Sequence, residues 1–161
     1  MITIEVNDRS VLDALHKLAD AMADTTPLMA DVAGVLLGES ERQFASESGP
    51  LGAWPGLSDT TQALRAKAGY WPGKTLQQSG QLAASVQVEH GNGWASIGSN
   101  KVYAPMQFFG GTTSAQSMIP NKRIPARPFL PMNPETHAIT PEAEQTVLEV
   151  LSGWLDKIIA N

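Results

Sequence analysis

Hydrophobic residues recur at helical spacing in three separate parts of the chain. In the first part, residues 11–22, apolar side chains stand three and four positions apart. The second begins at Thr25 or Thr26, either of which can cap a helix, and ends before Gly49. The third begins at residues 140–142, where threonine, proline and glutamate stand in an order typical of a helix start. The pattern therefore predicts two helices near the N-terminus and one near the C-terminus.

Alternation of apolar and polar side chains predicts short strands between these helices. Residues 2–6 alternate in this way, and residues 82–88 are apolar at their even-numbered positions. The tripeptide Gly91-Asn92-Gly93 supplies a turn, so residues 82–97 are predicted to form a β-hairpin. Residues 102–109 fit either a single helical turn or a strand. The predicted fold class is α+β, a small antiparallel sheet with a β-hairpin, packed by the N-terminal helices and the C-terminal helix.

Glycine and proline interrupt regular structure in two long segments. Residues 49–80 carry six glycines and three prolines around one short helix, which is predicted from Ser58 to Lys67. Residues 110–118 are predicted to form a second flexible loop. Long excursions of this kind inside a domain tend to have a binding role. We expect both segments to become ordered on assembly with other subunits.

Residues 124–131 read Ile-Pro-Ala-Arg-Pro-Phe-Leu-Pro. Each proline fixes φ near −65° and removes a backbone donor, so the segment can form neither a helix nor an interior strand. The prediction is a stiff, extended, proline-rich arm that carries one cation, Arg127, and the apolar side chains of Phe129 and Leu130. Such an arm is expected to lie against another surface.

Length, composition and charge narrow the class of protein. The 161 residues fit a single domain, 1–161, and the absence of cysteine excludes disulfides and agrees with a reducing compartment. No apolar run approaches the roughly 18–20 residues that span a bilayer, and the N-terminus does not resemble a signal peptide. The chain is therefore expected to be made in the cytoplasm, with no membrane partner.

Charge is distributed unevenly along the chain. Residues 1–49 hold nine acids and three bases, a net charge of −6, whereas residues 50–161 have a net charge of +1. No acid occurs between His90 and Pro134. The basic segment is expected to be a solvated or subunit-facing surface, or to meet an acidic partner such as the acidic helices of a neighbouring copy. Sequence-specific DNA binding is not expected, since the sequence pI is about 5.1.

No catalytic constellation emerges from the reactive side chains. Residues 68–75 fit a relaxed phosphate-loop pattern that ends in Lys74 and Thr75, but the preceding residues read as helix and Pro72 lacks an N–H group for phosphate. The three histidines are scattered, and Glu39 and Glu41 are expected to belong to a solvated acidic face. We therefore expect no enzyme activity, no cofactor and no metal, and keep a nucleotide-binding enzyme as a distant alternative.

Six short elements between about residues 50 and 131 together resemble the phage virion morphogenesis family. They are Trp54-Pro55-Gly56-Leu57-Ser58; Leu76, Ser79, Gly80, Leu82 and Ser85; Ile97-Gly98-Ser99; Tyr103-Ala104; Phe109-Gly110-Gly111; and Ile124 to Leu130. Each element alone is weak, but six in the same order are specific. One departure is Gln107, which stands where the family often has histidine. That departure argues against a titrating or metal-binding role at this position.

The resemblance implies a structural protein of a tailed bacteriophage that is similar to tail-completion and tail-terminator subunits. By analogy, copies would form a hexameric ring at the head–tail junction, with the tail-tube protein and neck or connector proteins as partners. DNA would only pass through the ring lumen. The expected location is the virion tail or neck, after assembly in the host cytoplasm. A head-completion or neck connector subunit is the alternative reading.

Eight residues are expected at the contacts between subunits. Arg127, fixed between prolines, is expected to anchor a contact to the acid-rich first helices of a neighbouring copy while the monomer folds without it. Aromatic residues of the loops are candidates because interface cores are enriched in aromatic side chains. The full set is Arg127, Phe129, Pro125, Trp54, Trp71, Phe109, Lys122 and Arg123.

Overall fold

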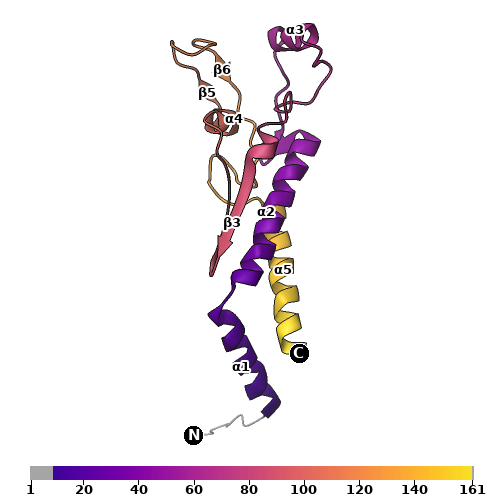
Figure 1. Cartoon of the computed structure of the whole chain (residues 1–161), viewed down its shortest axis with the longest axis vertical. Coiled ribbons are helices and arrows are strands. Elements are labelled where there is room, and N and C mark those ends of the chain that lie inside the picture. Colours follow the sequence, from indigo (N-terminus) through magenta and orange to yellow (C-terminus); the bar gives the residue numbers. More distant parts are fainter. Residues whose placement is uncertain (1–8, 161) are drawn as a thin grey trace.

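The computed structural model describes residues 9–160, and the predicted strand at residues 2–6 lies outside them. Two long helices pack along each other and form the spine of the molecule, α2 (Thr26–Ser46) and α5 (Pro141–Ala160). Helix α1 (Arg9–Ala23) precedes them at the N-terminal end (Figure 1). These three helices confirm the predictions from hydrophobic spacing, and the α+β class is confirmed with them.

Two shorter helices come from the middle of the chain. Helix α3 (Asp59–Lys67) confirms the short helix predicted from Ser58 to Lys67. Its N-cap is Ser58, whose side chain accepts a hydrogen bond from the backbone N–H of Thr61 at 3.3 Å. Helix α4 (Ala104–Phe109) decides the open assignment of residues 102–109 in favour of a helical turn.

The strands pair as three separate two-stranded antiparallel ribbons within residues 9–160. The largest is the predicted hairpin, β3 (Val86–Gly91) with β4 (Trp94–Ser99), joined by a two-residue turn. Strand β3 begins four residues later than predicted, because Ala83–Ser85 form a 3₁₀ turn, η1, closed by a bond from the Ser85 hydroxyl to the Leu82 carbonyl. Alternation alone does not distinguish this turn from a strand end.

The two glycine-rich segments contain more regular structure than the sequence predicts. Strands β1 (Ser48–Gly49) and β2 (Gly52–Ala53) pair directly after α2. In the second segment, β5 (Gly111–Thr112) pairs with β6 (Arg123–Ile124), a ribbon that the sequence analysis did not predict. The expectation that residues 49–80 and 110–118 gain order on assembly stays a prediction.

The core lies where the C-terminal half of α2 meets the hairpin, the 3₁₀ turn and α4. Phe129, which is 1% exposed, packs its ring 5.4 Å from that of Phe44 and 5.7 Å from that of Phe108. Trp54 meets the ring of Phe44 edge-on at 5.6 Å. Pairs of this geometry add to the stabilisation from apolar burial. Residues from four distant parts of the chain therefore share one aromatic cluster.

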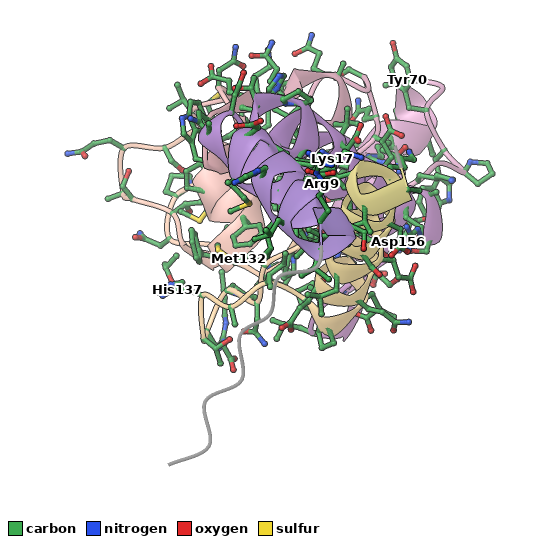
Figure 2. The ribbon with its side chains drawn as sticks, turned by 90° about the horizontal axis from the view of Figure 1, so that it is seen from below. Arg9, Lys17, Tyr70, Met132, His137 and Asp156 are labelled. Carbon is green, nitrogen blue, oxygen red and sulfur yellow. The ribbon has the colours of Figure 1, made fainter. Side chains whose placement is uncertain are left out.

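Helix α1 stands apart from this core. None of its residues is buried, and even Leu15 and Met22 of its apolar stripe are more than half exposed. It packs against α5. Figure 2 views the molecule from the end opposite to the core and labels Arg9 and Lys17 of α1 and Asp156 of α5. The tip of the hairpin fixes the start of α2, because Asn92 accepts hydrogen bonds from the N–H and hydroxyl of Thr25 at 3.0 and 2.8 Å.

Two projections extend from the core end of the molecule. Helix α3 and the loop that follows it form one projection, and the β5–β6 ribbon forms the other (Figure 1). The proline-rich arm meets both: it continues from β6, and Arg127 hydrogen-bonds the carbonyls of Pro55 and Gly56 in the loop before α3.

Candidate functional site

The proline-rich arm is anchored inside its own chain. The indole N–H of Trp54 donates a hydrogen bond to the Pro128 carbonyl at 2.9 Å, and the Ser40 hydroxyl donates one to the Phe129 carbonyl at 2.6 Å. Because the prolines lack N–H groups, the arm cannot join a sheet ladder, and side chains satisfy its carbonyls instead. The arm therefore lies against this chain's own α2 and β2 loop at residues 128–129.

Arg127 is fixed by three hydrogen bonds within the chain. Its backbone N–H donates to the Gln107 carbonyl at 2.8 Å, its Nε donates to the Pro55 carbonyl at 2.8 Å, and its Nη2 donates to the Gly56 carbonyl at 2.9 Å. The residue is 6% exposed. Its guanidinium holds the loop after β2, so Arg127 has a role within the monomer besides the predicted contact between subunits.

Arg65, a residue of α3, lies in the same region as the Arg127 side chain. It is 7% exposed, and its Nη1 donates to the Lys74 carbonyl at 2.9 Å. Its Nε is buried and donates no hydrogen bond. Arg65 was missed in the sequence analysis. A basic residue is common in the last turn of a helix, where it interacts favourably with the helix dipole, so its presence there did not indicate a site.

The two arginines line one groove between the two projections. The groove has a volume of about 500 Å³, and Arg123, which is exposed, is a third cation on its wall. Hydroxyl groups also line it, and no acidic side chain does. The hydroxyl-bearing residues are Ser58, Thr61, Ser79 and Tyr103.

The electrostatics of this groove are those of an unpaired cation cluster. Burial lowers the pKa of Arg127, and the positive charge of Arg65 lowers it further. Arg42 forms an ion pair with Glu39, but neither Arg65 nor Arg127 has a carboxylate within 4.0 Å among residues 9–160. The carboxylate whose pKa responds to Arg65 is Glu47, but the larger causes of its lowered pKa are hydrogen bonds from the side chain and then the backbone N–H of Thr75, the latter at 2.7 Å from Oε2.

The eight predicted contact residues fall into three groups. Phe129 and Trp54 are core residues, and Arg127 is buried in the wall of the groove. Pro125 is half-buried and lines the groove with Arg123. The others are exposed outside it: Trp71, Phe109 and Lys122. The structure thus brings Arg123, Pro125 and Arg127 together in the groove, and the other five residues do not line it.

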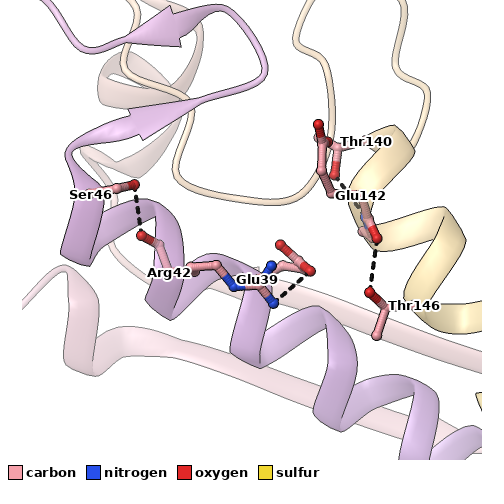
Figure 3. Close-up of polar contacts among 7 residues, drawn as sticks. Glu39, Arg42, Ser46, Thr140, Glu142 and Thr146 are labelled. Carbon is pink, nitrogen blue, oxygen red and sulfur yellow. Dashed lines mark hydrogen bonds and ion pairs between the residues drawn. The ribbon is translucent and has the colours of Figure 1, made fainter.

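A second groove lies between the C-terminal half of α2 and the start of α5. Its volume is about 650 Å³, and Figure 3 shows the Glu39–Arg42 pair on one side of it and the start of α5 on the other. Glu39 is 4% exposed and lies 2.8 Å from Arg42. The prediction that Glu39 belongs to a solvated face was wrong, because α5 packs over this side of α2.

The segment that resembles a phosphate loop has other partners. Lys74 donates through Nζ to the Ala45 carbonyl at 3.0 Å, and the Thr75 N–H is taken by Glu47. A helix, α3, precedes the segment where a phosphate loop requires a strand. Within residues 9–160, no three His, Asp or Glu side chains are grouped as metal ligands would be. In the same range, no helix combines the length and apolar character needed to cross a membrane.

Comparison with known proteins identifies relatives over nearly the whole chain. The model of the phage virion morphogenesis family matches residues 6–156. The Mu-like prophage FluMu G protein 2 of Haemophilus influenzae is 33% identical over 160 residues, which cover 99% of each chain. The putative capsid assembly protein G of Escherichia phage Mu is 32% identical over 132 residues, 80% of this chain and 82% of that protein. No solved structure matches.

Proposed function

The chain belongs to the phage virion morphogenesis family, and we propose that it is a non-enzymatic structural protein that forms a ring and completes the phage tail at the head–tail junction. A role in phage virion assembly follows from the family itself. The observation that carries the ring is the separation of charge on one chain. A basic groove and an acid-rich helical surface are distinct regions, so each copy can present a different face to each neighbour.

The acid-rich surface is formed by α2 and α5, which lie side by side (Figure 1). These two helices together hold seven acids and two bases, a net charge of −5, and all of the acids except Glu39 are exposed. Contacts between unlike surfaces are heterologous, and they produce a closed ring when the rotation between neighbours divides a full turn. A hexamer is the stoichiometry we propose, with the tail-tube protein on one side and neck proteins on the other.

The proposal is tested on a phage in which the gene for this protein has been deleted. Overlong or unstable tails are expected, and expression of the chain in trans should restore tails of normal length. Electron microscopy of the lysate measures both. Normal virions with joined heads and tails in the absence of the chain would contradict the proposal.

A position on the head side of the junction is the second candidate. It is favoured by the name of the relative from phage Mu, a putative capsid assembly protein. In that case the deletion should leave tails of normal length that are not joined to heads. The same micrographs therefore distinguish a tail-completing ring from a head-completion or neck connector subunit. A nucleotide-binding enzyme has no support from the Lys74 loop, whose polar groups are engaged within the chain.

A further inference from the structure

We infer that the groove between α3 and the β5–β6 ribbon is a receptor for a carboxylate supplied by the α2–α5 surface of a second copy of the chain. The inference rests on the proposed self-assembly and names the site through which it takes place. It also changes the role predicted for Arg127, which becomes one wall of a receptor rather than a projecting anchor.

Two buried guanidinium groups without an acid are the observation behind this inference. Arginine keeps its charge at neutral pH, and removing a charge from water is costly unless an opposite charge compensates it. Arg65 and Arg127 are more than nine-tenths buried, and neither has a carboxylate within 4.0 Å among residues 9–160. Backbone carbonyls satisfy only part of their hydrogen-bonding capacity, and the Arg65 Nε has no acceptor. An incoming carboxylate would supply the missing negative charge.

The groove is also built to receive such a group. Arg127 is held by two carbonyl oxygens and Arg65 by a third, so both guanidinium planes are oriented before a ligand arrives. A guanidinium group binds a carboxylate through its N–H fork, and fixed geometry reduces the entropy lost on binding. Arg123 stands exposed on the β5–β6 ribbon, where it can attract an acid from solution.

A carboxylate of a second copy fits the groove better than a phosphate of DNA. A net charge of −5 and a pI of about 5.1 oppose approach to a polyanion. The α2–α5 surface, in contrast, exposes several acids, including Asp31 and Glu41 of α2 and Glu144 of α5. Helix α5 and the N-terminal half of α2, which carries Asp31, extend away from the two projections in Figure 1. A contact through these acids therefore joins different regions of two copies, head to tail.

Charge reversal at the exposed arginine tests the inference without disturbing the buried ones. Arg123→Glu should weaken self-association of the full-length chain by roughly tenfold or more, because a carboxylate then repels the incoming acid. Lys67→Glu is the matched control: it makes the same charge change at an exposed position of α3 outside the groove. Its association constant should stay within about threefold of the wild-type value, since exposed charges contribute little. Sedimentation velocity and native mass spectrometry measure both, and circular dichroism checks that each variant is folded.

Two further measurements identify the anion. Succinate, compared with chloride at the same ionic strength, should shift the side-chain NMR signals of Arg65 and Arg127 in dilute protein and should weaken self-association. A 20-base-pair DNA duplex should show no binding that depends on Arg123. Duplex binding abolished by Arg123→Glu would overturn the inference in favour of phosphate, and absence of succinate shifts would overturn the site itself.

The result also separates the inference from the proposed function. Equal association of wild type, Arg123→Glu and Lys67→Glu would refute the carboxylate receptor and leave the ring intact. Normal virions without the chain would refute the proposed function, whereas the receptor would still be decided by the association constants.

Discussion

The indole nitrogen of Trp54 lies 2.9 Å from the carbonyl oxygen of Pro128 and donates a hydrogen bond to it. Replacing Trp54 by Phe keeps an aromatic ring but leaves this buried carbonyl without its donor, which costs ~1–3 kcal/mol. We expect the free energy of unfolding, measured by urea denaturation, to fall by that amount. Trp94→Phe, at a half-exposed position of the hairpin end, should cause a much smaller change. Equal losses in the two variants would show that the bond to Pro128 does not stabilise the arm.

Gly49 is required because the proline-rich arm passes directly over it. A Cβ atom at this position would lie 2.4 Å from the Pro128 carbonyl oxygen and 3.2 Å from the Trp54 indole nitrogen. Gly49→Ala must therefore displace the arm, and we expect a loss of ~1–3 kcal/mol or an unfolded chain. Gly38→Ala is the control, since nothing lies within 4 Å of a Cβ there and alanine favours the α2 helix by about 0.5–1 kcal/mol. The midpoint temperature of thermal unfolding should fall for Gly49→Ala and rise for Gly38→Ala.

Arg127 holds the loop after β2 and also lines the proposed receptor groove, and substitutions measure the first of these roles. Arg127→Lys keeps the charge but cannot reach both the Pro55 and Gly56 carbonyls with the geometry of a guanidinium fork. Hydrogen bonds to charged groups contribute ~1.5–3 kcal/mol, so a loss of about that size is expected in urea denaturation. Arg127→Glu should fail to fold, because it places a carboxylate against two carbonyl oxygens. A folded, fully stable Arg127→Glu monomer would contradict the intramolecular role.

The helices and the hairpin could be predicted from sequence because their signals are local. The Thr140 cap with Pro141, the apolar spacing of α1 and α2, and the turn at Asn92 and Gly93 each act within a few residues. The destination of the proline-rich arm could not be predicted in this way. Its partners, Ser40 and Trp54, lie 89 and 74 residues earlier in the chain, and proline chemistry says only that the arm is extended.

In the candidate site, too, the residues marked by their sequence neighbours could be predicted, and the residue placed by tertiary packing could not. Arg127 and Arg123 could be singled out because they stand near prolines in a segment without acids. Arg65 could not, since its importance depends on α3 folding over the groove beside Arg127. The prediction that Arg127 meets an acid of a neighbouring copy remains a prediction, now with a second arginine beside it.

Glu47 makes the attachment of the 74–75 loop dependent on pH. Hydrogen bonds from the side chain and the backbone N–H of Thr75 lower the pKa of its carboxylate below the ordinary value near 4.5. A lowered pKa in the folded state stabilises the fold above the pKa of the unfolded chain, and that contribution is lost as pH falls through the folded value. Wild type should therefore exceed Glu47→Gln in stability at pH 7, with the difference shrinking below about pH 4.5. Urea midpoints at pH 7, 4.5 and 3 measure this; a constant difference across the range would contradict it.

Asn92 joins the tip of the hairpin to the junction between α1 and α2. Its Oδ1 accepts from the N–H and hydroxyl of Thr25, its Nδ2 donates to the Ala23 carbonyl at 3.0 Å, and the Gly93 N–H donates to the Thr25 hydroxyl at 2.9 Å. Asn92→Asp retains the acceptor but turns the donor into an oxygen that faces the Ala23 carbonyl, so we expect a loss of ~0.5–1.5 kcal/mol. Because α1 has no buried residue to hold it, its amides should exchange with solvent faster while those of the core do not change. Hydrogen exchange measured by mass spectrometry reports both, with Asn100→Asp, an exposed asparagine, as control. Unchanged exchange in α1 would mean that its packing against α5 alone fixes its position.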